Sequence, residues 1–101
     1  MFVATLRRKT TVVKAEEFEQ RKASLLERLL PYLQRQPGFA GHELTHGEGG
    51  EMVEVTRWAT EADRTRYLRG GAAAMAATWM DAALPTAPYP NGTWVREYAA
   101  E

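Results

Sequence analysis

Two side chains within one short alternating segment are suited to acid–base chemistry beside an aromatic ring. Glu54 and Trp58 lie four residues apart in the segment EMVEVTRW, so on an extended strand they project to the same face. A carboxylate buried beside apolar groups has a raised pKa and can accept a proton near neutral pH. Glu54 is therefore a candidate general base and Trp58 a candidate platform for an aromatic ring. The alternatives are an interface ion pair for Glu54 and a core or interface position for Trp58.

Three further polar residues are candidates for contact with a substrate. Tyr67 can hydrogen-bond a substrate oxygen, and Arg57 and Arg96 can orient an anionic intermediate. The alternative for Tyr67 is packing on the sheet with its hydroxyl in water. For an arginine on a strand, an ion pair at an interface is the more common role.

The two histidines do not have the spacing of a metal site. His42 and His46 fall on a predicted strand, where four residues span roughly 13 Å at ~3.3 Å per residue, too far for one ion. The absence of cysteine excludes disulfides, thiolate metal sites and a cysteine nucleophile. We expect neither a metal nor a cofactor, and His42 alone remains a candidate acid or base.

Two further segments are candidates for the cavity wall. Met75 and Trp79 lie on one face of an alanine-rich helix with Met80, which suits an adaptable apolar wall but equally a plain core. Tyr89 lies in the proline-rich segment after this helix, which can form a lid or an ordinary crossover loop.

The elements that must position these residues follow from periodicity and from helix and turn signals. Alternation predicts four strands, at Phe2–Arg8, Phe39–His46, Glu51–Trp58 and Gly92–Ala99. The predicted hairpin between the second and third contains Gly47, Gly49 and Gly50.

An apolar stripe at 3.6-residue spacing predicts a first helix over Ala15–Gln36. Pro31 is expected to kink or break it near Leu30, because proline removes a hydrogen bond. A capping sequence at Thr60–Asp63 begins a second helical region. Gly70 and Gly71 should break that region before a further helix over Ala72–Leu84.

This order predicts one α+β domain over residues 1–101, with the ferredoxin-like order β-α-β-β-α-β and a four-stranded antiparallel sheet. The two helices of this order lie on one face of the sheet and leave the other face uncovered. The uncovered face is too apolar to stay in water, with Val3, Val55, Trp94 and Tyr98 on the strands. We therefore expect a homodimer that pairs the sheets of two subunits.

Composition excludes several classes of partner. Thirteen basic and thirteen acidic residues cancel, so the basic excess typical of nucleic-acid binding is absent. No segment approaches the ~20 apolar residues of a membrane-spanning helix, and the N-terminus has no signal-peptide pattern. We expect a cytoplasmic protein that binds neither nucleic acid nor membrane.

Two motifs carry a resemblance to a known family. The turn Gln36–Phe39 after the first helix, and the segment Glu54–Glu61 (EVTRWATE), resemble the antibiotic biosynthesis monooxygenase family of the dimeric α+β barrel superfamily. The resemblance implies oxidation of anthrones or quinols without metal or flavin. It further implies that the protein deprotonates the substrate and that the resulting carbanion reacts with molecular oxygen to give a quinone.

The resemblance extends to individual residues only in part. The family's tryptophan at the end of the third strand corresponds to Trp58. Glu54 stands where some members have asparagine, and Tyr67 stands where many have histidine. Heme-degrading relatives need a histidine on the second helix and an asparagine on the first strand. This chain has no histidine after His46, and its only asparagine is Asn91, so heme degradation is not expected.

Sequence and resemblance together favour a cofactor-independent monooxygenase acting on an aromatic polyketide-like phenol, anthrone or quinol. One alternative is a polyketide cyclase-like or small-ligand-binding barrel without redox activity. A second is a structural dimerisation domain without a ligand.

Overall fold

The computed structural model describes residues 1–86 and the backbone of residues 96–100. The elements are β1 (Phe2–Lys9), α1 (Ala15–Gln34), β2 (Phe39–His46), a 3-10 turn at Glu48–Gly50, β3 (Glu51–Trp58), α2 (Glu61–Arg69), α3 (Ala72–Ala83) and β4 (Arg96–Ala100). The α+β class and the element order agree with the sequence prediction. Of the predicted fourth strand, residues 92–95 lie outside the described residues.

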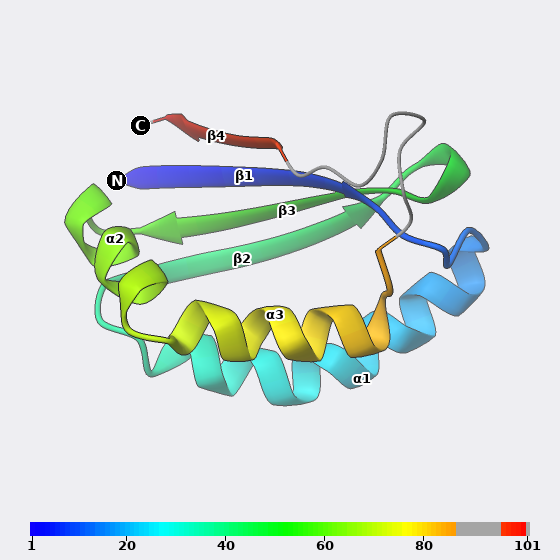
Figure 1. Ribbon diagram of the computed structural model, residues 1–101, viewed down its shortest axis with the longest axis horizontal. Helices are drawn as coiled ribbons and strands as arrows, with labels where there is room; N and C mark the ends of the chain where they lie inside the picture. Colours follow the sequence, from blue (N-terminus) through cyan, green and yellow to red (C-terminus); the bar gives the residue numbers. More distant parts are fainter. Residues whose placement is uncertain (87–95, 101) are drawn as a thin grey trace.

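The strands form an antiparallel sheet in the order β2-β3-β1-β4, and the helices cover one of its faces (Figure 1). The register fixes which side chains share the covered face. Leu6 on β1 and Leu44 on β2 flank Glu54 of β3 directly, while Ala4 and His42 flank Thr56 in the same way. Because side chains alternate along each strand, all six of these residues project toward the helices.

Helix α1 packs on the sheet through an apolar stripe. Its buried residues are Phe18, Leu25, Leu29 and Leu33, whose spacings of seven, four and four residues place them on one face of the helix. A kink or a break was predicted near Leu30, but the helix runs through Pro31 without a break. Pro31 lies on the exposed side, away from the stripe.

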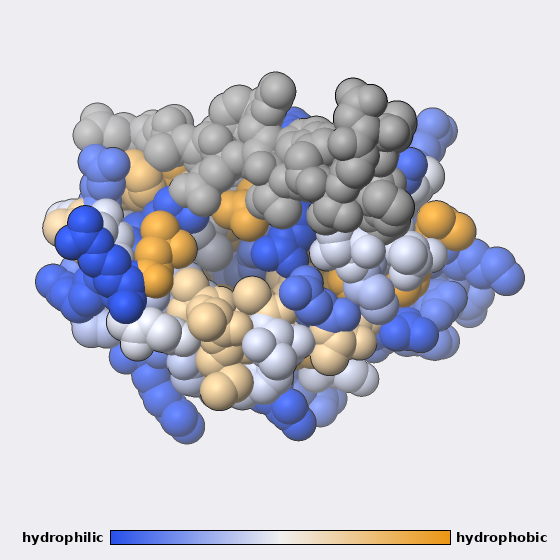
Figure 2. Space-filling model, in the orientation of Figure 1, coloured by the Kyte–Doolittle hydropathy of each residue, from blue (hydrophilic) through white to orange (hydrophobic). Residues whose placement is uncertain are grey.

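The second helical region divides where the sequence predicts. The Thr60 hydroxyl accepts a hydrogen bond from the backbone N–H of Asp63 at 3.1 Å and caps α2. Gly70 ends α2, and Gly71 has a left-handed φ of 85°, which suits glycine and turns the chain into α3. Figure 2 shows weakly apolar residues over α3, whereas hydrophilic residues gather along α1 below it.

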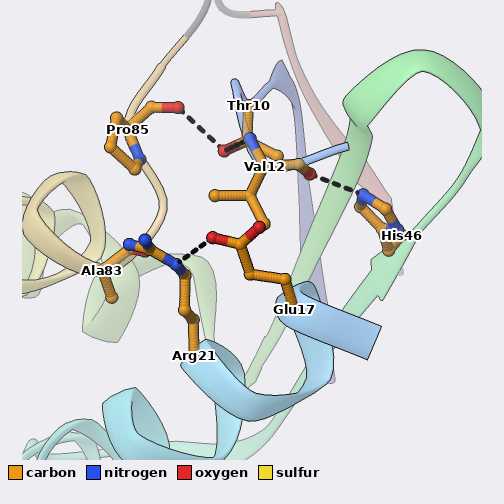
Figure 3. A network of polar contacts seen from close by, with 7 residues as sticks. All are labelled: Thr10, Val12, Glu17, Arg21, His46, Ala83 and Pro85. Atoms are coloured by element: carbon orange, nitrogen blue, oxygen red, sulfur yellow. Dashed lines mark hydrogen bonds and ion pairs between the residues drawn. The ribbon is translucent and has the colours of Figure 1, made fainter. Parts of the chain in front are cut away.

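A buried threonine joins the end of β1 to the segment after α3. The Thr10 hydroxyl donates to the carbonyl of Pro85 at 2.8 Å and accepts from the backbone N–H of Val12 at 3.2 Å (Figure 3). The carbonyl of Val12 in turn accepts from Nε2 of His46 at 2.9 Å. This network fixes the ends of β1, β2 and α3 relative to one another.

Within the described residues, no helix combines the length and the apolar character needed to cross a membrane.

Candidate functional site

A cavity of about 190 Å³ lies between the covered face of the sheet and the helices α2 and α3. Strands β1 and β3 form its floor, while α2 and α3 form its roof. Its walls are mainly apolar, with a few polar groups, the composition expected of a small-molecule site. The lining residues are Leu6, Arg8, Glu54, Thr56, Arg64, Tyr67, Leu68, Ala73, Ala76, Ala77 and Met80.

The carboxylate of Glu54 lies on the cavity wall with a histidine directly behind it. Nε2 of His42 lies 2.8 Å from a carboxylate oxygen of Glu54. The side chain of His42 is 1% exposed and that of Glu54 is 20% exposed, so only the carboxylate reaches the cavity. Because an ionised carboxylate only accepts hydrogen bonds, His42 donates from Nε2 and fixes the orientation of Glu54. The pair has the geometry of an acid–base group held by a buried partner.

Tyr67 faces Glu54 from helix α2. Burial raises the pKa of the Tyr67 phenol well above its ordinary value of 10.0, and the nearby negative charge of Glu54 raises it further. The phenol therefore stays protonated at physiological pH. A protonated phenol on the cavity wall can donate a hydrogen bond but cannot act as a base.

Trp58 is completely buried and does not line the cavity. Its indole N–H donates to the hydroxyl of Thr56 at 3.0 Å, and its ring lies 4.9 Å from that of Tyr67. The expectation that Trp58 and Glu54 face the same cavity therefore does not hold within one subunit. The tryptophan instead supports two residues, Thr56 and Tyr67, that form the cavity wall.

Two arginines that the sequence analysis did not consider also line the cavity. Arg8 lies on the covered face of β1, and Arg64 lies one helical turn before Tyr67 on α2. Alternation from Leu6 places Arg8 on this face, and the three-residue spacing from Tyr67 places Arg64 beside it. The sequence pattern alone therefore places both arginines on the side of the cavity. They were not considered because a charged residue on a strand or helix more often faces solvent.

Three of the predicted substrate-binding residues lie elsewhere. Arg57 projects from the opposite face of the sheet, because it alternates with Thr56 and Trp58, and it forms an ion pair with Glu43. Met75 is exposed on α3 and does not reach the cavity. Trp79 faces α1, where its ring meets Tyr32 edge-on at 4.9 Å. Tyr89 and the side chain of Arg96 lie outside the described residues.

Two other hollows are shallower surfaces without comparable chemistry. One of about 700 Å³ runs along the outside of α2 and is lined by that helix and Gly70 alone. Another of about 280 Å³ lies between α1 and α3 around Trp79. Among residues 1–86, whose side chains the structure describes, no three histidine, aspartate or glutamate side chains gather as metal ligands.

No protein-family model and no curated protein matches this sequence. Solved structures do match over nearly the whole chain. SnoaB, a cofactor-independent oxygenase from Streptomyces nogalater, is 22% identical with a TM-score of 0.63, and the match covers 99% of this chain and 91% of SnoaB.

Two further matching structures contain bound ligands. The monooxygenase from the ActVA-Orf6 gene of Streptomyces coelicolor, in complex with nanaomycin D, is 17% identical with a TM-score of 0.65 over 98% of this chain and 84% of its own. A MhuD variant with two manganese protoporphyrin IX bound per active site is 20% identical with a TM-score of 0.64 over 100% and 93%. The chain therefore has the fold of the antibiotic biosynthesis monooxygenase structures, and the resemblance found in the sequence is confirmed at the level of the fold.

Proposed function

We propose that the protein is a cofactor-independent monooxygenase that oxidises an aromatic polyketide-like phenol, anthrone or quinol with molecular oxygen. The observation that carries the proposal is the carboxylate of Glu54, which lies on the wall of a mostly apolar cavity and is held from behind by His42. The oxygenases that share the fold support it.

The first chemical step is removal of a proton from the substrate. Glu54 accepts the proton from a phenolic hydroxyl, or from the carbon of an anthrone, and the substrate becomes an electron-rich anion. The protonated Tyr67 donates a hydrogen bond to the oxygen on which the negative charge collects. Both residues lie on the same cavity, so one bound ring can meet both.

The second step consumes molecular oxygen. The substrate anion forms a carbon–oxygen bond with O2, and the resulting peroxide loses water to leave a carbonyl group. The substrate loses two hydrogen atoms and gains one oxygen atom, and the second oxygen atom leaves in the water. The substrate itself supplies the electrons, so the reaction balances without a further reductant.

We also propose that two subunits pair through the sheet face opposite the helices. That face carries Val3, Val53 and Val55, which are only partly buried within one subunit. The ion pair between Arg57 and Glu43 lies on the same face. A second copy of the sheet would cover these apolar side chains and complete a barrel.

Oxygen consumption separates this function from the cyclase-like alternative, which needs an acid–base pair but no oxidant. Purified protein should consume O2 with an anthrone or a naphthol, and isotopically labelled O2 should place one labelled atom in the quinone. Conversion of the substrate without O2 uptake would favour the cyclase-like alternative. Absence of both binding and conversion would favour a structural role.

A further inference from the structure

Thr56 lies on the cavity wall between the candidate base Glu54 and the buried Trp58. The three residues alternate along β3, so their side chains project to the same face of the sheet, and neighbours on that face are roughly 7 Å apart. An aromatic ring in the cavity that meets the carboxylate of Glu54 can therefore also reach the side chain of Thr56.

The direction of the hydrogen bond between Trp58 and Thr56 is fixed by the two groups themselves. An indole N–H can only donate, so the hydroxyl of Thr56 accepts it, at a distance of 3.0 Å. Trp58 is completely buried, and this bond satisfies its N–H. A threonine hydroxyl has two lone pairs and one hydrogen, so the bond occupies a lone pair and leaves the hydrogen free to donate.

Within residues 1–86, the bond from Trp58 is the one side-chain hydrogen bond that Thr56 forms. The indole N–H repels the hydroxyl hydrogen from its own side. It also makes the hydroxyl a stronger donor, because hydrogen bonds in a chain polarise one another. Thr56 lines the cavity, so an oxygen atom of a bound ligand can accept this hydrogen.

Tyr67 supplies a second hydroxyl donor from the other side of the cavity. Thr56 belongs to the floor on β3, and Tyr67 belongs to the roof on α2. Both contact Trp58: the hydroxyl of Thr56 accepts its N–H, and the ring of Tyr67 lies 4.9 Å from its ring. Donors placed where negative charge develops stabilise an oxyanion, and proton removal by Glu54 develops that charge on a substrate oxygen.

We propose that Thr56 is a further catalytic residue, which donates a hydrogen bond to the substrate oxyanion together with Tyr67. Trp58 is then a positioning residue that acts through Thr56. The inference rests on the proposed function for the reaction, but the ionisation of a bound ligand reports the donor pair without any oxidation. If Thr56 only satisfies the buried indole, its loss lowers stability and leaves the ionisation of the ligand unchanged.

The test uses para-nitrophenol, whose phenolate is yellow, with the full chain in excess and without oxygen. Absorbance against pH gives the pKa of the bound phenol. Thr56→Val removes a donor to the phenolate at nearly constant shape, and should raise this pKa by about 1–2, the usual worth of a hydrogen bond to a charged group. Thr56→Ser keeps the hydroxyl and should restore most of the wild-type value. Thr11→Val, at an exposed position outside the cavity, should leave it unchanged.

Trp58→Phe tests the positioning role. It removes the N–H but keeps an aromatic ring, and should raise the pKa of the bound phenol by less than Thr56→Val does. In the double variant it should add nothing to the effect of Thr56→Val, because the hydroxyl through which Trp58 acts is already gone. The double variant also removes both partners of the buried bond. It therefore replaces Thr56→Val if the single variant fails to fold by circular dichroism.

The outcomes separate the donor pair from the oxidation. An unchanged pKa in Thr56→Val, or no detectable binding of para-nitrophenol to wild type, would overturn the donor role of Thr56. An equal effect of Trp58→Phe with and without the hydroxyl of Thr56 would overturn the positioning role. A raised pKa in Thr56→Val, with no oxygen uptake by wild type on an anthrone or naphthol, would refute the monooxygenase and leave the donor pair standing. Oxygen uptake by wild type with an unchanged pKa in Thr56→Val would do the reverse.

Discussion

Replacement of Thr10 by valine removes two hydrogen bonds while the shape of the side chain stays nearly the same. Thr10 is completely buried, and its hydroxyl links Val12 to Pro85. The carbonyl of Pro85 keeps a second partner, the backbone N–H of Thr11 at 3.0 Å. The main cost therefore falls on the buried N–H of Val12, which loses its acceptor.

The lost hydrogen bonds and the gained methyl group together predict a measurable loss of stability. An unsatisfied buried donor costs about 1–3 kcal/mol, and the lost bond to Pro85 adds about 0.5–1.5 kcal/mol. The new methyl group recovers somewhat less than about 1 kcal/mol. We expect Thr10→Val to lower the free energy of unfolding by about 1–3 kcal/mol. For a chain of this length, each kcal/mol lowers Tm by about 4–8 °C.

Urea unfolding followed by tryptophan fluorescence measures this change. Wild type and variant are compared at one protein concentration, because dimerisation makes stability depend on concentration. The urea concentration at the midpoint of unfolding should fall, while the slope of the unfolding free energy against urea concentration should stay the same. Thr11→Val is the matched control, since Thr11 is exposed and should change stability by less than about 0.5 kcal/mol. A Thr10→Val variant as stable as the control would refute the role of this network.

Three further predictions follow from individual contacts. Gly50→Ala should destabilise the fold much more than Gly49→Ala: both have left-handed φ angles, 87° and 66°, but a Cβ on Gly50 would lie 2.2 Å from the carbonyl oxygen of Thr10 and one on Gly49 would meet nothing. Unfolding titrations should show about 1–2 kcal/mol for Gly49→Ala and a larger loss for Gly50→Ala. Because the pKa of Tyr67 is higher in the folded state, that state holds one more proton above about pH 10, so stability falls there with rising pH. Tyr67→Phe should lose less stability over that range, and an equal loss would contradict the buried phenol. Sedimentation should give about twice the chain mass of 11.4 kDa at micromolar concentration, and a monomer at 100 µM would contradict the proposed dimeric barrel.

The sequence predicted the fold better than the site because the two depend on different information. Alternation in EMVEVTRW and the 3.6-residue stripe of α1 report burial directly, so β3 and α1 were found with nearly correct ends. The helix is not broken near Leu30 because it already exposes the side that carries Pro31, and only three residues follow that proline within it.

Placement of the site required knowledge of which strands are neighbours. Alternation correctly places Glu54 and Trp58 on one face of the strand, but it does not predict how deeply each side chain is buried. Trp58 is covered by Phe39 and Tyr67, while Glu54 faces the cavity. The contact between His42 and Glu54 depends on the register of β2 against β3. That register comes from pairing over a distance of twelve residues, which the local pattern of either strand does not specify.

The proton transfer assigned to Glu54 is tested most directly by Glu54→Gln, which keeps the size of the side chain and its contact with His42 but cannot accept the proton. With a substrate that supports oxygen uptake, the account predicts a turnover about 10²–10⁴-fold slower, the usual worth of a general base. The dissociation constant and the dimer should be unchanged. Glu27→Gln, an exposed position on α1, serves as the control and should retain full turnover. A Glu54→Gln variant that turns over at the wild-type rate, or that loses only its dimer, would contradict the account.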